Sequence, residues 1–545
     1  METKLTHTTY LEGTRDVIRT SWWNSIINHG LRGPYTYLFM KNGLYYEATK
    51  GTDGTLAFGG VTNAGGATGT SCHSVLNAAI QACSQGAKIF VKSGTYTLTA
   101  SVVDNIGVTI EGEHGAGDIF FCDDAALTGY TNKNGVLFVD GDATGIDMFK
   151  IGYKTIGAAN TLTFGPRLKN LGFSGYASIP GVYSDTKDNK AVSCSNIQAG
   201  KFENLAFYHK EYGLYCTATN DEVPLNYSDV NFFDYLLFAF NKRGLYITGS
   251  GGNSRVENVW SYINQYNGVY VGNYYDIKIR NIMSNADAWN NATAGDGAAV
   301  RVACTYGNAL IENVDVVGYN SGTTESSFTG VTVDPSAFKA HGKIWLKNIL
   351  VQGTDSNAIH IAAGGLAGTS VFIRDIYVGS PDTESVYGGA ANSGDVGGAV
   401  VYNDSGLTTK VFVDGGYADC EQADTVDSWF KNCYSVQNLE NFNKILYLGG
   451  GATIFDNTTD LIGFSCATDA ATPTASTVYT VNGGDLIVSS TDSGNADASI
   501  TIRDAVNETV QAGLSSFAQL YIPVGYDINW GNFSGADPTV TVHGV

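Results

Sequence analysis

The sequence predicts an all-β protein whose strands wind as a solenoid, and three observations support this prediction. A phrase of four residues, namely an apolar residue, a charged residue, Asn and a second apolar residue, recurs between Arg167 and Ile376. Consecutive copies lie 23 to 35 residues apart, which is too uneven for a helical repeat but fits strand-built coils with variable loops. The composition agrees, because only 15% of the 545 residues are charged, while Gly occurs 67 times and Tyr 32 times.

The recurring phrase has a physical reason. Strand alternation puts the residue two before Asn inside and the charged residue outside, yet the residue after Asn is apolar again, so the chain must turn at Asn. Stacked at about 4.8 Å, buried Asn side chains at this corner would hydrogen-bond to one another as a ladder. The copies are 168–171, 202–205, 256–259, 279–282, 311–314, 346–349 and, with Asp for Asn, 373–376, with a degenerate copy at Asn231 and Phe232.

The charged residue before each Asn gives an independent check. In a parallel stack these residues are neighbours between coils, and opposite charges on neighbouring strands stabilise a sheet whereas like charges destabilise it. From residue 257 onward their signs alternate until the last pair: Glu257, Arg280, Glu312, Lys347 and Arg374.

A second strand follows each corner, often after a Gly, and its outward positions predict a column on the surface. This column is Tyr215, Tyr246, Tyr270, Arg301, Thr332 and His360. The strands that contain the corners present another outward column, which is apolar: Phe233, Trp260, Met283, Leu350 and Tyr377. An exposed apolar column of this kind is more typical of a subunit interface than of a sugar site.

The segment before the coils predicts a cap. Residues 37–46 fit a hairpin that turns at Asn42 and Gly43. An amphipathic helix is expected over residues 72–84, with Ser71 or Thr70 as its N-cap, and it leads into a first strand that begins at Lys88. Because a solenoid exposes its apolar end unless something covers it, we interpret the helix as the cap of the first coil.

This order of helix, apolar strand and Gly-Thr-Tyr (94–96) resembles the first coil of the pectin-lyase-like family of right-handed parallel β-helices. The resemblance covers about residues 50–440, and the opening segment is also similar to tailspikes and to β-helix surface proteins of archaea and their viruses. It implies a right-handed parallel β-helix with an N-terminal capping helix.

The Asn phrase ends before about residue 450, and short alternating strands follow, which predicts a C-terminal β-sandwich of jelly-roll type. The expected strands are 478–481, 485–489, 499–503, 519–524 and 539–543. We therefore expect four parts: an aromatic attachment or capping module (1–50), a linker with the cap helix (51–87), the parallel β-helix (88–440) and the sandwich (450–545).

Charge and apolar runs exclude several classes of partner. With 31 basic and 52 acidic residues the net charge is −21, which argues against nucleic acid and against an anionic membrane surface. The first residues lack the apolar core of a signal peptide, and no run of about 18 apolar residues predicts membrane insertion.

The nine Cys show no metal-type spacing, so we expect no metal and no other cofactor. Most of them are expected to be buried thiols. The candidate disulfides are Cys72 with Cys83 and Cys420 with Cys433.

Carbohydrate binding needs flat aromatic faces beside polar groups, because sugar rings offer apolar faces ringed by hydroxyls. Tyr215, Tyr246 and Tyr270 on successive coils would form such a strip with a step of about 4.8 Å. Trp289 and Arg301 are further candidates. The alternative is that Tyr is simply favourable at an outward strand position, and both interpretations stay open at this point.

Cleavage of a polysaccharide needs two carboxylates or, for a lyase, a base and a group that neutralises a uronate. Several acids, Asp287 among them, are expected on the same coils as Arg301. The catalytic candidates are Asp296, Asp315, Glu325 and His360. Two catalytic patterns of the family are absent: the polygalacturonase pattern (Asn-Thr-Asp, Asp-Asp, Gly-His-Gly) and the lyase pattern (Arg-x-Pro-x-x-Arg). For each acid the alternative to a catalytic role is therefore that of a solvated loop residue. For His360 the alternative is that of a surface strand residue.

The resulting hypothesis is an extracellular or virion-surface spike or fibre, assembled as a homotrimer or other homo-oligomer, that binds cell-surface polysaccharide with or without cleaving it. One alternative is a secreted polysaccharide lyase or glycoside hydrolase. The other is a structural subunit of an extracellular filament or sheath.

Overall fold

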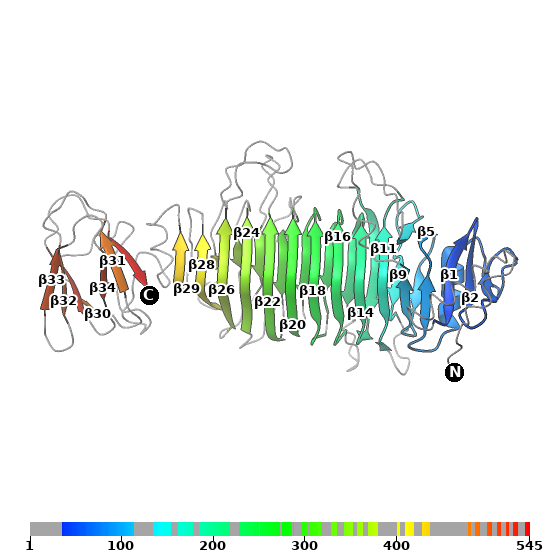
Figure 1. Cartoon of the computed structure of the whole chain (residues 1–545), viewed down its shortest axis with the longest axis horizontal. Coiled ribbons are helices and arrows are strands. Elements are labelled where there is room, and N and C mark those ends of the chain that lie inside the picture. Colours follow the sequence, from blue (N-terminus) through cyan, green and yellow to red (C-terminus); the bar gives the residue numbers. More distant parts are fainter. Residues whose placement is uncertain are drawn as a thin grey trace, which may run out of the picture.

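The structure is a computed structural model. It describes residues 35–113, 135–153, 162–177, 185–217, 228–249, 251–272, 275–285, 287, 297–303, 306–317, 329–334, 343–352, 357–362, 369–379, 401–403, 409–418, 428–435 and seven strands between 478 and 544. Long strands from successive coils lie side by side along the long axis of the molecule (Figure 1).

The first sheet has 17 strands, and those from successive coils pair in parallel and in register. Val256 pairs with Ile279, for example, and Ile279 pairs with Ile311. Its coil strands are β4 (Lys88–Val91), β5 (Gly94–Leu98), β7 (Thr109–Gly112), β8 (Val136–Asp140), β11 (Arg167–Ser174), β14 (Lys201–Tyr208), β16 (Phe232–Ala239), β18 (Arg255–Tyr262), β20 (Tyr275–Asn285), β22 (Tyr306–Val317), β24 (Lys343–Gln352), β26 (Thr369–Gly379), β28 (Thr409–Ala418) and β29 (Ser428–Ser435).

A second sheet of ten parallel strands completes the coils, and two short strands, β10 (Thr163–Phe164) and β13 (Ile197–Gln198), pair separately. The spatial order of the ten strands follows the order of the coils along the chain, and each connection crosses over through the first sheet, which confirms the predicted parallel β-helix. They are β6 (Val102–Asp104), β9 (Phe149–Ile151), β12 (Lys187–Ser195), β15 (Lys210–Thr217), β17 (Arg243–Ile247), β19 (Asn267–Gly272), β21 (Ala298–Ala303), β23 (Thr329–Val333), β25 (Ile359–Ile361) and β27 (Val401–Asn403).

The Asn of each phrase is the corner at which a long strand of the first sheet bends. Asn258, Asn281 and Asn313 have φ values of 54°, 54° and 57°, in the left-handed region that Asn tolerates better than most residues. Asn281 Nδ2 donates to Asn258 Oδ1 at 2.9 Å, and Asn313 Nδ2 donates to Asn281 Oδ1 at 3.0 Å. The predicted ladder is confirmed, but the prediction that it is buried was wrong, because the left-handed corner turns these side chains outward and both of these hydrogen bonds are exposed.

The degenerate copy of the phrase was misplaced. Phe202 pairs with Phe233, and Leu205 pairs with Leu236, so the corner of this coil is Tyr235, with a φ of 51°. Asn231 is instead buried before the strand, where its Oδ1 accepts a hydrogen bond from the backbone of Gly200 at 2.8 Å. A large aromatic residue therefore interrupts the ladder.

The predicted alternation of charge before the corners is confirmed. Glu257 pairs in register with Arg280, and Arg280 pairs with Glu312. Glu312 forms an ion pair with Arg280, whose Nε lies 3.2 Å away, and accepts a hydrogen bond from Lys347 Nζ at 2.9 Å. These contacts tie neighbouring coils together on the surface.

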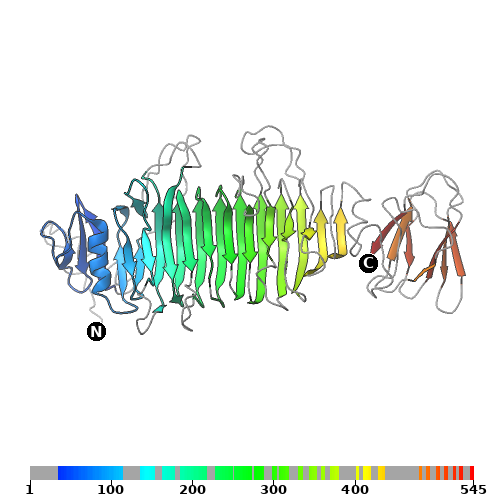
Figure 2. The same ribbon diagram turned by 180° about the vertical axis from the view of Figure 1, so that it is seen from behind.

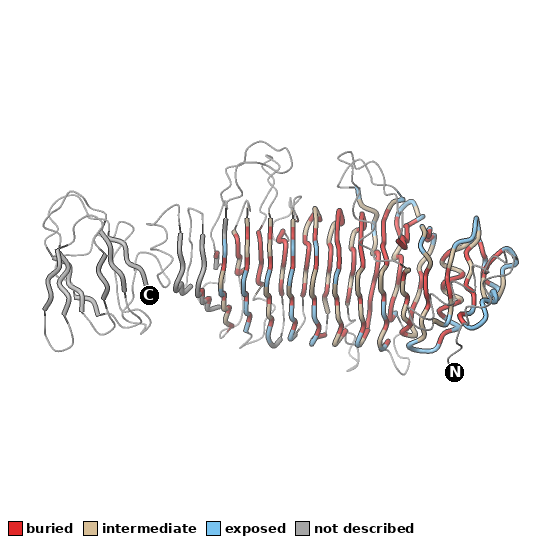
Figure 3. Tube along the Cα trace, viewed as in Figure 1, coloured by how far each residue is buried: buried red, intermediate tan, exposed pale blue. Residues whose placement is uncertain are grey.

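The inward side chains form one continuous apolar core from Phe39 to Val413. Figure 3 shows buried residues recurring along the strands of successive coils. Phe173, Phe207 and Phe238 stack face to face on successive coils, with ring centroids 5.4 and 5.0 Å apart. Cys194 and Cys216 are neighbours in this core and are buried free thiols, as expected for inward strand positions.

A second, buried polar ladder follows the corner strands, and it was not predicted. Asn241 Nδ2 donates to Asn264 Oδ1 at 3.0 Å, and Asn264 Nδ2 donates to Asp287 Oδ1 at 2.7 Å. Ser284 Oγ donates to Asp287 Oδ2 at 2.6 Å. The alternative that Asp287 is a solvated loop residue was wrong, because this residue is 1% exposed and its carboxyl accepts hydrogen bonds from Asn264 and Ser284.

The N-terminal part of the described chain is a hairpin, β1 (Tyr37–Asn42) and β2 (Tyr45–Lys50), followed by β3 (Leu56–Gly59) and α2 (Cys72–Gln81). The predicted hairpin and helix are therefore present, and β1 also pairs in parallel with β4 of the first coil. The N-cap of α2 is Ser71, whose hydroxyl accepts from the backbone of Ser74.

The apolar face of α2 is buried. The helix lies beside the hairpin and the first coil at the N-terminal end, as Figure 2 shows. The role of α2 as a cap stays a prediction. Cys72 and Cys83 are free buried thiols, so their predicted disulfide was wrong; Cys304 and Cys420 lie outside the described residues.

The C-terminal strands form two antiparallel sheets of four and three strands. The five expected strands are present within a few residues, together with two that were not expected, β33 and β35. The set is β30 (Val478–Thr480), β31 (Leu486–Ser490), β32 (Ser499–Arg503), β33 (Thr509–Gly513), β34 (Gln519–Ile522), β35 (Asp527–Gly531) and β36 (Val540–Gly544). The jelly-roll topology and the four domain boundaries stay predictions.

Candidate functional site

The predicted outward column of the second sheet exists, and we call it the tyrosine file. Tyr215 pairs in register with Tyr246, Tyr246 with Tyr270, and Tyr270 with Arg301. Its full membership along β9 to β27 is Lys150, Ser193, Tyr215, Tyr246, Tyr270, Arg301, Thr332, His360 and Tyr402. Because the coils do not slip in this part of the sheet, residues far apart in sequence become direct neighbours.

The three tyrosine rings stack on one another, with a cation at each end. The centroids of Tyr215 and Tyr246 are 5.6 Å apart and those of Tyr246 and Tyr270 are 4.3 Å apart, with interplanar angles of 5° and 9°. Lys190 Nζ lies 5.0 Å from the centroid of Tyr215, and Arg301 Cζ lies 5.9 Å from that of Tyr270. Such cation–π contacts are worth about 0.5–1 kcal/mol at exposed sites.

This stacking changes what the file offers to a ligand. Each face of the Tyr246 ring is covered by a neighbouring ring, so a sugar cannot stack on it. The Tyr270 ring leans along its own strand over Gly272, where a Cβ would lie 2.6 Å from the tyrosine hydroxyl. The expectation of flat aromatic faces was therefore wrong for the centre of this file, which presents ring edges, hydroxyls and flanking cations instead.

A second file beside the first contributes residues that the sequence reasoning missed. Lys190 pairs with Tyr212, and Tyr212 pairs with Arg243. The Arg243 guanidinium lies 5.3 Å from the ring of Tyr212, 5.8 Å from that of Tyr246 and 4.8 Å from that of Tyr266. The signal was present, because Tyr212 and Arg243 both directly precede the Gly of a Gly-Leu-Tyr segment.

Burial raises two tyrosine pKa values at this surface. The pKa of Tyr246 is raised by burial and, to a lesser extent, by its tyrosine neighbours. Burial raises the pKa of Tyr153 to about 12, although its hydrogen bond with the Ser193 hydroxyl acts in the opposite direction. Both hydroxyls therefore remain protonated near neutral pH and act as hydrogen-bonding groups, not as charges.

The catalytic candidates do not form a common site among the described residues. Asp296 and Glu325, like Trp289 of the sugar-binding set, lie outside those residues. Asp315 belongs to the first sheet, where it pairs with Met283 and Leu350, whereas His360 belongs to the tyrosine file of the second. The expectation that Asp315 would join Arg301 and His360 was wrong, because the strands concerned lie in different sheets.

Asp315 interrupts the apolar column of the first sheet. One of its carboxyl oxygens is buried without a hydrogen-bond partner, and burial raises the pKa of this carboxyl. Trp260, Met283 and Tyr377 of the same column are 39%, 48% and 44% exposed. The assignment of Phe233 to this column was wrong, because it is buried at an inward position and Leu237 pairs with Trp260 instead.

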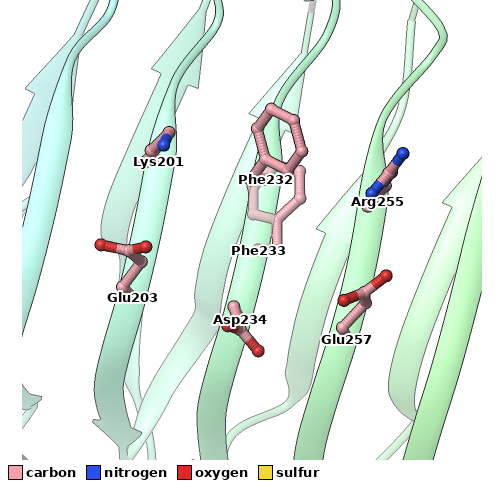
Figure 4. A pocket seen from close by; sticks show the side chains of 7 residues that line it. All are labelled: Lys201, Glu203, Phe232, Phe233, Asp234, Arg255 and Glu257. Carbon is pink, nitrogen blue, oxygen red and sulfur yellow. The ribbon is translucent and has the colours of Figure 1, made fainter.

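A small pocket lies on the outer face of the first sheet (Figure 4). Phe232 lies between two cations, with Lys201 Nζ 5.7 Å and Arg255 Cζ 5.8 Å from its ring centroid. Three carboxylates from neighbouring coils, Glu203, Asp234 and Glu257, line its other side. Its volume is about 90 Å³, well below the ~300 Å³ at which ligand pockets usually begin, so we assign it no ligand.

Neither a metal site nor a membrane span emerges from the described residues. No three His, Cys, Asp or Glu side chains among them are arranged to hold an ion. The helical segments described are too short or too polar to cross a bilayer.

No protein-family model matches the sequence, and no curated protein matches it. Among solved structures, the chain is similar to the enzymatically active domain of tailspike protein 4 of bacteriophage CBA120, with 11% identity and a TM-score of 0.38 over 90% of this chain and 68% of that one. It is similar to a tailspike of an Acinetobacter phage, with 11% identity and a TM-score of 0.39 over 86% and 81% of the two chains. It is also similar to a family 28 exopolygalacturonase of Yersinia enterocolitica, with 10% identity and a TM-score of 0.33 over 72% and 80%.

Proposed function

We propose that this chain recognises polysaccharide along the tyrosine file of its second sheet and serves as an extracellular or virion-surface spike. The observation that carries the proposal is the stack of Tyr215, Tyr246 and Tyr270 between Lys190 and Arg301 on one face of a regular solenoid. The stack fixes polar groups of three successive coils in a row, with a step of about 4.8 Å that is comparable to part of a sugar repeat.

The rigidity of the row favours a polymeric ligand. Each ring is held by its neighbours, so binding does not have to immobilise flexible side chains. Hydroxyls that both donate and accept suit a sugar chain, which carries the same groups.

An array of polysaccharides incubated with the full chain, scored for both retention and fragmentation, tests the proposal. Tyr246→Phe removes a hydroxyl and keeps the ring stack, so it is expected to weaken retention without unfolding the protein. Tyr377→Phe, on the first sheet, is the matched control and is expected to leave retention unchanged. Failure of every glycan to be retained, or equal effects of the two variants, would overturn the proposal.

Assembly as a homotrimer or other homo-oligomer is part of the proposal, and the apolar column of the first sheet supports it. Trp260, Met283 and Tyr377 are each more than a third exposed, and an exposed apolar column of this length favours burial against another surface. Sedimentation of the full chain measures the number of copies, and a monomer at all concentrations would contradict this part.

Cleavage of a polysaccharide that contacts the first sheet, and not of the one bound along the tyrosine file, is a second proposal, and Asp315 is the residue that favours it. A carboxyl whose pKa is raised by apolar surroundings has the property that a general acid needs. Asp315→Asn distinguishes catalysis from assembly. If Asp315 is a general acid, the variant releases no reducing ends; if the column is an interface, removal of a buried charge strengthens association instead.

A further inference from the structure

The charge of the tyrosine file departs from that of the whole chain. Acidic residues outnumber basic ones by 52 to 31 in the sequence. The neighbouring file consists of Lys190, Tyr212, Arg243, Asn267, Ala298 and Thr329. In the described registers the two files together contain Lys150, Lys190, Arg243 and Arg301, and no Asp or Glu.

Two carboxylates just outside the files contact these cations. Asp147 lies 3.7 Å from Lys190 Nζ and 3.9 Å from Lys150 Nζ, and Asp334 lies 3.1 Å from Arg301. Four cations beside two carboxylates leave the strip positive. Sheet formation alone does not require cations at the partly exposed positions of these files, whereas Asn267, Ala298 and Thr329 of the neighbouring file are buried.

The cations also extend over several coils. Lys190 is on β12, Arg243 is two coils further on β17, and Arg301 is two coils further again on β21. At about 4.8 Å per coil, they are spread over roughly 20 Å. A single small anion would use one of them, whereas an extended polyanion can contact all three.

We propose that the polysaccharide bound along these files is acidic, with carboxylate, sulfate or phosphate groups that the cations contact while the tyrosine hydroxyls bond to the sugar hydroxyls. The inference rests on the proposed function and adds the substrate class. The stacking carries it, because the ring faces are occupied by one another and by the cations. Recognition is therefore left to hydrogen bonds and charge, and a guanidinium held over a ring presents its N–H groups in the planar geometry that carboxylate and phosphate accept.

Binding of the full chain to hyaluronan, in which every second sugar is a uronate, to the neutral polymer dextran and to inorganic sulfate tests the inference. Hyaluronan is expected to bind and dextran to bind much more weakly. Raising the salt from about 50 to about 500 mM is expected to weaken hyaluronan binding, because the cations are near the surface. Inorganic sulfate at the same charge concentration is expected to compete poorly.

Three variants connect the binding to named residues. Arg243→Gln is expected to weaken hyaluronan binding by about tenfold or more, because it removes a charged donor from the centre of the strip. Arg255→Gln is the matched control, since this arginine also lies over an aromatic ring but on the first sheet, and it is expected to have no effect. Asp334→Asn frees Arg301 from its carboxylate and is expected to tighten binding several-fold, a gain that a misfolded variant does not give.

The outcomes separate this inference from the proposed function. If dextran binds as tightly as hyaluronan and Tyr246→Phe weakens both, the strip binds polysaccharide but the acidic class is wrong. If Asp334→Asn weakens hyaluronan binding, or Arg255→Gln matches Arg243→Gln, the assignment to these files is wrong. If hyaluronan does not bind and the array retains no other acidic glycan, the inference is overturned; if the array retains no glycan of any kind, the proposed function is overturned as well.

Discussion

Replacement of Tyr235 is expected to stabilise the protein, although most substitutions in a regular fold destabilise it. Tyr235 occupies the left-handed corner that Asn fills in the neighbouring coils, with a φ of 51°. For a residue with a bulky side chain this conformation costs about 1–2 kcal/mol. The ring is 65% exposed, so its removal sacrifices little apolar burial.

The magnitude can be worked out for three variants. Tyr235→Gly removes the steric cost but adds about 0.5–1 kcal/mol of chain entropy, so the net gain is near 0.5–1 kcal/mol. Tyr235→Asn tolerates the corner and restores a ladder position between Asn204 and Asn258. Asn258 already donates to Asp234 at 2.8 Å, so the ladder adds about one exposed hydrogen bond and the total gain is ~1–2 kcal/mol. Tyr235→Ala keeps the steric cost and is expected to be close to wild type.

Urea unfolding of the full chain, followed by far-ultraviolet circular dichroism, measures the free energy of unfolding. We expect it to be highest for Tyr235→Asn, lower for Tyr235→Gly, and lowest and about equal for Tyr235→Ala and wild type. Hydrogen exchange at the amides of β14, β16 and β18 localises the effect to this coil, because stacked coils contact only their neighbours. A Tyr235→Gly protein less stable than Tyr235→Ala would refute the reasoning, since it would mean that the corner is not strained by a side chain.

Two further predictions concern buried charges. Lys210→Met is expected to cost about 3–5 kcal/mol in urea unfolding, because it leaves Asp140 buried without the ammonium that now lies 2.7 Å away. The control Lys242→Met removes an exposed pair and is expected to cost less than about 1 kcal/mol; equal losses would contradict the burial argument. Burial raises the folded-state pKa of Asp287, so its contribution to stability is full below the unfolded pKa of about 3.9 and is lost as pH rises through the folded pKa. Asp287→Asn keeps an acceptor for Asn264 and does not ionise. In thermal unfolding, its stability relative to wild type is therefore expected to rise as pH is raised from 3 to 7. A relative stability that falls over this range would contradict a raised pKa for Asp287.

The repeated features of the fold could be predicted from sequence because they are local. A pattern of four residues predicts each corner. The register between coils follows once the corners are aligned, so Tyr215, Tyr246 and Tyr270 could be placed in one file. The corner at Tyr235 was missed because it has Tyr in place of Asn, while the apolar residues of the phrase are present on both sides of it. Aligning the apolar residues on both sides of the corner, rather than the Asn itself, would have found it.

The candidate site could be predicted only in part, because its chemistry depends on packing between coils. Packing between neighbouring coils determines the side-chain rotamer of Tyr246. Its ring faces are covered by Tyr215 and Tyr270 as a result, which the sequence of a single coil does not show. Asp315 and His360 were expected together because both fall in the same part of the chain. Asp315 directly follows the Asn phrase of one coil, whereas His360 lies in the strand after a corner, and the bend of the chain at the corner puts these two kinds of strand in different sheets.

Stacking of identical positions explains why the informative residues are those that break the repeat. In a parallel coil, a side chain first contacts its counterparts above and below, so a run of like residues satisfies itself, as the Asn ladder and the tyrosine stack do. A residue that differs from its neighbours has groups that the stack does not satisfy. Asp315 between Met283 and Leu350 is such a break, and so is Arg301 at the end of the tyrosines. Natural sequences depart from local rules chiefly where a strained or functional site requires it. We therefore expect subunit contacts to concentrate at Asp315, and the charged contacts of a ligand on the tyrosine file to concentrate at Arg301 and the other cations that border the stack.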